Sequence, residues 1–92
     1  MAARLRCVVH GHVQGVGFRA YIQAHSLALG LGGRVRNLPD GSVEVTAIGP
    51  RVSLEKLLEH CRTGPIAASV GKVDAEWTVA EQDEYPFFDI DP

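Results

Sequence analysis

The chain has 92 residues, of which 46% are hydrophobic and 22% charged, a size and composition typical of one domain with its own core. These values exclude disordered, collagen-like and coiled-coil chains. Residues 1–46 carry five basic and two acidic groups, whereas residues 47–92 carry four basic and nine acidic groups. All five basic residues of the first half are arginines, so a small anion fits the sequence better than nucleic acid.

The two cysteines, Cys7 and Cys61, lie far apart and form no CxxC pair. Their spacing predicts neither a disulfide framework nor a zinc site, and we interpret both as small buried hydrophobic residues in a protein of the reducing cytoplasm. No apolar run approaches the roughly 18 residues of a membrane span. We therefore expect a cytoplasmic monomer without a membrane or nucleic-acid partner.

The first half of the chain predicts a strand, a helix and a hairpin. β-Prone residues predict a strand over residues 4–9, and a glycine-rich loop follows it. Apolar residues at helical spacing predict a helix over residues 18–29. Residues 33–37 and 42–48 read as a hairpin, because the segment Leu-Pro-Asp-Gly at 38–41 has strong turn chemistry.

The second half adds a helix and further strands. After Gly49-Pro50, apolar residues at 54, 57, 58 and 61 predict a second helix that ends at Gly64-Pro65. Residues 70–79 alternate as a strand, and residues 87–90 could add a short final one. The order βαββαβ predicts a single α+β domain over residues 1–92, a ferredoxin-like sandwich whose antiparallel sheet carries both helices on one face.

The segment VHGHVQGVGFR, residues 9–19, carries the chemistry. Its three glycines permit positive φ angles and leave backbone N–H groups uncovered where a strand passes into a helix. Together with the positive end of the helix dipole, such a loop makes a concave anion site. Arg19, in the first helical turn, can close this cradle with its guanidinium fork.

The segments VHGHVQGVGFR and GRVRNLPDGSVEVTAIG, which together span residues 9–49, closely resemble the two signature segments of the acylphosphatase family. The resemblance implies hydrolysis of the carboxyl-phosphate bond of small-molecule acyl phosphates, with no metal and no organic cofactor, and with inorganic phosphate or sulfate as product or inhibitor. It places the phosphate-binding arginine at Arg19 and the asparagine that orients the attacking water at Asn37. The cradle amides would come from Gln14, Gly15, Val16, Gly17, Phe18 and Arg19.

The chemistry of these residue types is consistent with that mechanism. A carboxylate is a good leaving group, so positioning and charge stabilisation suffice without a strong nucleophile. Asn37 cannot act as a general base near neutral pH, but its amide can fix a water in line with the phosphorus. We expect the water's proton to pass to the substrate's own phosphate oxygen, because the motifs assign no carboxylate or histidine to that role.

Two positions depart from the commonest pattern of the family. Arg34 stands where an aromatic residue is usual, which affects acyl-group preference and local packing rather than phosphate chemistry. His12 stands where many relatives have an arginine, so a titratable group replaces a permanent charge near the cradle.

An alternative from another class is a non-catalytic anion-binding or regulatory module, since acylphosphatase-like domains also occur within larger carbamoyl-transfer maturation enzymes. The presence of both Arg19 and Asn37 favours the enzyme. The segment GVGFRA formally matches the dinucleotide fingerprint, but its acidic partner, Asp40, lies in a turn and the chain is too short for a doubly wound domain. The same segment faintly resembles an RNA-recognition sequence but lacks its leading basic residue.

A metal site built from histidines is a further alternative. His10 and His12 form an HxH pair, to which His25 or His60 could add a third ligand. Two histidines at i and i+2 without a neighbouring carboxylate or thiolate make a poor site, so we predict no metal centre.

Overall fold

The computed structural model describes residues 2–81 and 85–92. Neither helix in these ranges has the length and apolar character needed to cross a membrane. The helices begin and end within a residue or two of the predicted positions. The first strand is five residues longer than predicted, and the ends of the other strands differ from the prediction by at most a single residue. The elements are, in chain order, β1 (Ala2–His12), α1 (Phe18–Ala28), β2 (Gly32–Asn37), β3 (Val43–Gly49), α2 (Arg51–Thr63), β4 (Ser69–Ala80) and β5 (Phe88–Ile90).

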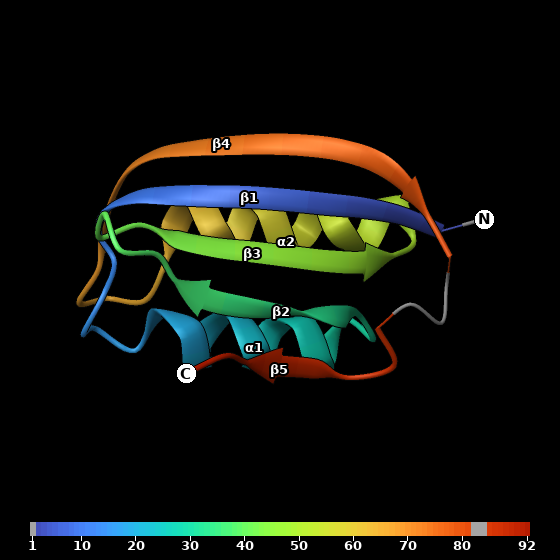
Figure 1. Cartoon of the computed structure of the whole chain (residues 1–92), viewed down its shortest axis with the longest axis horizontal. Coiled ribbons are helices and arrows are strands. Elements are labelled where there is room, and N and C mark those ends of the chain that lie inside the picture. Colours follow the sequence, from blue (N-terminus) through green and yellow to red (C-terminus); the bar gives the residue numbers. More distant parts are fainter. Residues whose placement is uncertain (1, 82–84) are drawn as a thin grey trace.

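The strands form one sheet in the order β4-β1-β3-β2-β5, and both helices cover the same face of it (Figure 1). Neighbours among β4, β1, β3 and β2 are antiparallel, which confirms the ferredoxin-like fold. The prediction of a wholly antiparallel sheet needs one correction, because β5 pairs parallel with β2. β5 begins at the end of the sheet where β4 finishes, so it runs back in the direction of β2 (Figure 1).

The core lies between the sheet and the two helices. Alternate residues of β1, such as Leu5, Cys7 and Val9, are fully buried on the helix side, whereas Arg4 and Arg6 lie on the open face. The prediction that both cysteines are buried is confirmed, since Cys7 and Cys61 have no exposed surface. The helices contribute the buried side chains of Phe18, Ile22, Leu54, Leu57, Leu58 and Cys61.

β1 extends well beyond its β-prone residues because it pairs with β3 on one side and with β4 on the other. Its pairing with β4 shifts register between His10 and Gly11, where the chain bulges. Gly11 has a φ of 130°, and a Cβ there would collide with the carbonyl oxygen of Ser69. The bulge therefore requires glycine, and the loop that leads to α1 begins directly after it.

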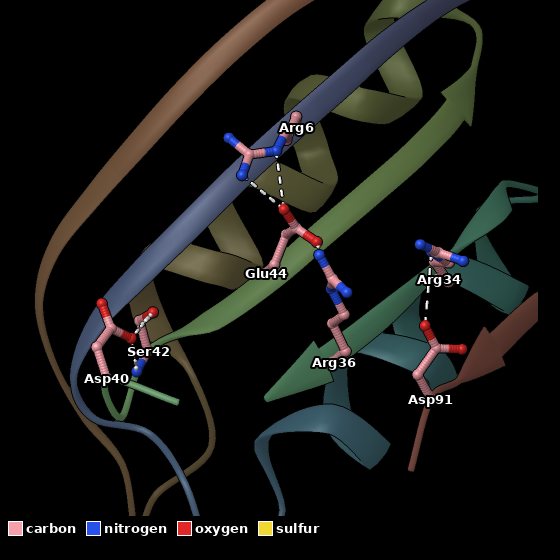
Figure 2. Close-up of polar contacts among 7 residues, drawn as sticks. All are labelled: Arg6, Arg34, Arg36, Asp40, Ser42, Glu44 and Asp91. Atoms are coloured by element: carbon pink, nitrogen blue, oxygen red, sulfur yellow. Dashed lines mark hydrogen bonds and ion pairs between the residues drawn. The ribbon is translucent and has the colours of Figure 1, made fainter. Parts of the chain in front are cut away.

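On the open face, Glu44 joins two strands to its own. Its Oε2 accepts a hydrogen bond from Arg6 Nε at 2.9 Å, and its Oε1 accepts one from Arg36 Nε at 2.7 Å (Figure 2). The side chain of Glu44 is 9% exposed. Burial alone would raise the pKa of Glu44, but the hydrogen bonds and positive charges of Arg36 and Arg6 outweigh it and hold that pKa below its ordinary value. One carboxylate thus ties β1, β3 and β2 together.

We expect Glu44→Gln to lower the free energy of unfolding at pH 7 by about 1–2 kcal/mol, because charged hydrogen bonds to two half-exposed arginines are lost. The folded pKa of Glu44 is depressed, so this contribution is fully present above the unfolded value near 4.3 and is lost as pH falls through the folded pKa. Urea unfolding from pH 7 to pH 3 should show the two proteins converging in acid. Glu59→Gln, which removes an exposed pair with Arg62, is the control and should show a small difference. A gap that stays constant to pH 3 would contradict this account.

Candidate active site

The loop at residues 13–17, which we call the cradle loop, connects β1 to α1 (Figure 1). Gly15 and Gly17 have φ angles of 75° and 79°, a region that glycine occupies without strain. Gly17 is also the N-cap of α1, and no side chain caps that end of the helix. An added Cβ would meet nothing within 4 Å at either glycine. The glycines are therefore required by the backbone conformation, and the space beside them is open to a ligand.

A pocket of about 190 Å³ lies where the cradle loop, the start of α1 and the end of β2 meet. Arg19 and Asn37 both line it, so the structure brings together the two side chains that the sequence singles out. Sites for drug-sized ligands measure roughly 300–1,000 Å³, so this pocket suits a small head group rather than a large ligand. Its full lining consists of Val13, Gly15, Gly17, Phe18, Arg19, Ala20, Asn37 and Ile90.

Arg19 is oriented by the end of the chain. Its Nη1 donates a hydrogen bond of 2.8 Å to the backbone carbonyl of Asp91. That carbonyl is held in turn, because the Asp91 N–H donates to the carbonyl of Val35 at 2.9 Å. Within residues 2–81 and 85–92, no carboxylate pairs with Arg19. Its positive charge is thus available to an anion in the pocket.

Asn37 is the last residue of β2 and pairs with Val43 of β3. Its Oδ1 is buried and receives no hydrogen bond from the described part of the chain. A buried acceptor without a partner is rare in folded proteins, and Ser26 Oγ in α1 is the other such atom among the described residues. The Oδ1 of Asn37 therefore holds no other part of the fold and is available to a water or a ligand.

Two predicted cradle residues do not line the pocket with their side chains. Val16 packs against the hydrophobic core, and the Gln14 side chain turns toward the connection between β2 and β3. Only the backbone amides of these two residues are candidates for ligand binding. Sequence reasoning missed Ile90 and Asp91, because their approach to the site depends on the pairing of β5 with β2.

The acidic groups near the site are engaged elsewhere. Asp40 accepts hydrogen bonds from the side chain and the backbone N–H of Ser42, and these lower the pKa of its carboxyl group (Figure 2). This contact closes the β2–β3 turn. Asp40 therefore stabilises the turn and is not placed to bind the ribose of a dinucleotide. Glu44 lies between its two arginines on the open face, whereas Asn37 faces the pocket. Neither carboxylate is placed as a general base.

Arg34, the departure from the family pattern, reaches the Asp91 carboxylate, with Nε 3.5 Å from Oδ2 (Figure 2). Arg34 is on β2, and Asp91 is the residue whose backbone carbonyl orients Arg19. The arginine therefore supplies an ion pair to the chain end beside the site. This contact lies outside the pocket lining.

The four histidines lie at separate places in the fold, apart from one stacked pair. His10 pairs with Asp74 at 3.2 Å on the open face of the sheet. His25 and His60 stack on each other, with ring centroids 3.7 Å apart, on the two helices. His12 is exposed. In the part of the chain that the structure describes, no three side chains of the types that bind metals are grouped closely enough to hold an ion.

A larger hollow of about 450 Å³ contains none of the predicted site residues. It lies beside the first residues of β2 and the last residues of β3, at the other end of these strands from Asn37. Among residues 2–81 and 85–92, its lining includes Leu27, Ile48 and Phe87 and no charged residue. The described lining therefore offers no positive charge of the kind that an anion site requires.

We expect Gly17→Val to lower both phosphate affinity and the free energy of unfolding, and Gly17→Asn to lower them less. Gly17 has left-handed backbone angles of φ 79° and ψ 16°, which cost a non-glycine residue about 1–2 kcal/mol and which asparagine adopts more readily than valine. Phosphate titration and urea unfolding of both variants measure the difference. Full phosphate affinity and normal stability in the valine variants of Gly11, Gly15 and Gly17 alike would contradict the cradle.

The comparisons with known proteins identify a family for this chain. A sequence profile of the acylphosphatase family matches residues 5–90. A protein of Mycolicibacterium smegmatis named acylphosphatase is 56% identical over 75 residues, which are 82% of this chain and 76% of the relative. An acylphosphatase of Thermus thermophilus is 51% identical, over 80% of this chain and 84% of the relative. The crystal structure of acylphosphatase from Bacillus subtilis matches with a TM-score of 0.93 at 31% identity, covering 98% of this chain and 99% of that one. The fold, the two signature segments and these relatives together show that the chain belongs to the acylphosphatase family.

Proposed function

We propose that the pocket between the cradle loop and Asn37 is the active site at which this acylphosphatase hydrolyses the carboxyl-phosphate bond of acyl phosphates. The observation that carries the proposal is the shared pocket: Arg19, without a carboxylate partner among the described residues, lines it together with Asn37, whose Oδ1 has no hydrogen bond. Family membership supports the reaction, and the pocket supports the assignment of residues.

The phosphoryl group would be held by main-chain N–H groups of residues 14–19 and by Arg19. The N-terminus of α1 carries no side-chain cap, so its amides and its dipole are available to an anion. Arg19 offers the N–H groups that its contact with Asp91 leaves unused. The acyl group would extend out of the pocket, whose volume of about 190 Å³ suits the phosphoryl head.

The attacking water would be oriented by the Asn37 amide. Its oxygen attacks the phosphorus in line with the acyl oxygen, and the phosphorus–oxygen bond to the acyl group breaks, with its electron pair leaving on the carboxylate. The proton of the water passes to a phosphate oxygen, and the products are a carboxylate and inorganic phosphate. The engagement of Asp40 with Ser42 and of Glu44 with its arginines supports this substrate-assisted transfer.

Inorganic phosphate and sulfate would occupy the same cradle and compete with the substrate. We also propose that the protein acts as a monomer in the cytoplasm, on small molecules. Binding of acyl phosphate without turnover would instead favour a regulatory module.

The two key side chains should fail in different ways when replaced. Asn37→Ala should keep its affinity for inorganic phosphate within a few-fold while kcat falls by about 10²–10³, since a contact of the transition state is lost. Arg19→Ala should lose both phosphate affinity and turnover. Arg19→Lys should recover little, because an ammonium cannot reproduce the guanidinium fork. Inhibition by phosphate and the rate on an acyl phosphate, measured for each variant, provide the comparison.

The control for these variants is a phosphomonoester, whose poorer leaving group should make it a much worse substrate for the wild type. Turnover of acyl phosphate by Asn37→Ala at near the wild-type rate would refute the role of its amide. Normal phosphate affinity in Arg19→Ala would refute the binding role of Arg19.

We expect turnover to be unchanged by a metal chelator, because backbone amides and Arg19 provide the charge stabilisation that the proposed mechanism requires. The initial rate should be measured before and after incubation with EDTA and again after addition of magnesium or zinc. Activity that disappears with the chelator and returns with a metal ion would overturn the mechanism and make the histidines candidate metal ligands.

A further inference from the structure

The Gln14 side chain connects the cradle loop to the turn between β2 and β3. Its Nε2 donates to the carbonyl of Leu38 at 2.8 Å and to the carbonyl of Ser42 at 2.9 Å. A primary amide has two N–H donors, and here both are used. The bonds span 24 and 28 positions of sequence, so they join two separate parts of the fold.

The turn that Gln14 contacts is closed by its own bonds. Leu38 N donates to Ser42 O at 2.8 Å, and Gly41 N donates to Leu38 O at 3.1 Å. Asp40 Oδ1 also accepts from Ser42 N at 2.9 Å. Gln14 therefore attaches the cradle loop to a turn that is already formed. Removing its amide would leave the turn intact and release its position relative to the cradle.

Leu38 directly follows Asn37, so the bond from Gln14 ends one residue from the amide assigned to the water. The cradle loop continues from β1, whereas Asn37 belongs to β2, and β3 lies between these two strands. The separation between the phosphate cradle and Asn37 is thus not fixed by direct pairing of their strands. A misplacement of a reacting or orienting group by about 1 Å can lower the rate by on the order of 10²-fold. A hydrogen bond that fixes Asn37 relative to the cradle therefore affects the rate.

We propose that Gln14 is a positioning residue, whose side-chain amide sets the place of Asn37 relative to the phosphate cradle. This inference rests on the proposed function of Asn37. It gives the side chain of Gln14 a role separate from the backbone amide that the residue contributes to the cradle.

The test is a double-mutant cycle with Gln14→Met and Asn37→Ala. Gln14→Met keeps the side-chain length and removes both donors. It should lower kcat by about 10–100-fold in the wild-type background and leave inhibition by inorganic phosphate within about threefold. In the Asn37→Ala background the same substitution should change kcat by less than about twofold, because the group to be positioned is absent.

Gln23→Met is the matched control. Gln23 donates its Nε2 to the carbonyl of Phe88 at 3.0 Å, so the same substitution removes a similar bond between a glutamine and a carbonyl. Any effect of Gln23→Met on kcat should be the same with and without Asn37. Thermal unfolding of all variants separates a loss of stability from a loss of positioning.

The outcomes distinguish this inference from the one on which it rests. Suppose that Asn37→Ala is slow. If Gln14→Met then lowers kcat by the same factor in both backgrounds, or lowers the affinity for inorganic phosphate by as large a factor as kcat, the positioning role of Gln14 is overturned while the role of Asn37 stands. If Asn37→Ala turns over like the wild type, the proposed role of Asn37 fails, and that of Gln14 fails with it.

A second variant covers the case in which Gln14→Met does not fold. In Gln14→Glu the ionised carboxylate has no donor, whereas the protonated acid has one O–H donor. The kcat of Gln14→Glu, divided by that of the wild type, should therefore rise as pH falls from 7 toward about 4.5, near the ordinary pKa of glutamate. A ratio that stays flat across this range would overturn the proposal.

Discussion

The position of β2 between β3 and β5 is the constraint on which the site depends. Its antiparallel partner β3 closes the turn that follows Asn37, and its parallel partner β5 leads to Asp91, whose carbonyl orients Arg19. The Asp91 N–H is itself bonded to Val35, in the middle of β2. A short strand thus fixes both the asparagine at its own end and, through its neighbour, the arginine on the helix opposite.

Most arginines of residues 1–46 lie outside the pocket, although their number predicts an anion site. An excess of arginines predicts an anion ligand, and Arg19 does line a pocket suited to one. Arg6 and Arg36 instead share Glu44, and Arg34 faces Asp91, all on the open side of the sheet. The arginine content therefore reflects mainly contacts that hold strands together, and the position of Arg19 at the start of α1 is what distinguishes it.

The order of the elements and the cradle could be predicted because each has a local cause. Helical spacing, the Pro-Asp-Gly turn and the glycines around Gly17 act over a few residues, and the positive φ angles appear where the glycine pattern requires them. The parallel pairing of β5 and the contact of Arg19 with Asp91 could not be predicted in this way. The strand pairing joins residues 55 positions apart, as in Gly33 and Phe88, and the contact joins residues 72 positions apart. A backbone carbonyl as acceptor also leaves no signal in the side-chain sequence. The unpaired Oδ1 of Asn37 likewise becomes visible only when its surroundings are placed.

The pocket lining has a consequence for how binding responds to acidity. Apart from Arg19, none of the described residues that line it carries an ionisable side chain, and arginine keeps its charge at every physiological pH. Donors of the main chain do not titrate either. The residues that line the cradle therefore carry the same charge in weakly acidic and weakly alkaline solution. A change in phosphate affinity over this range then comes from the protonation of the ligand itself or from His12, which directly precedes the cradle loop.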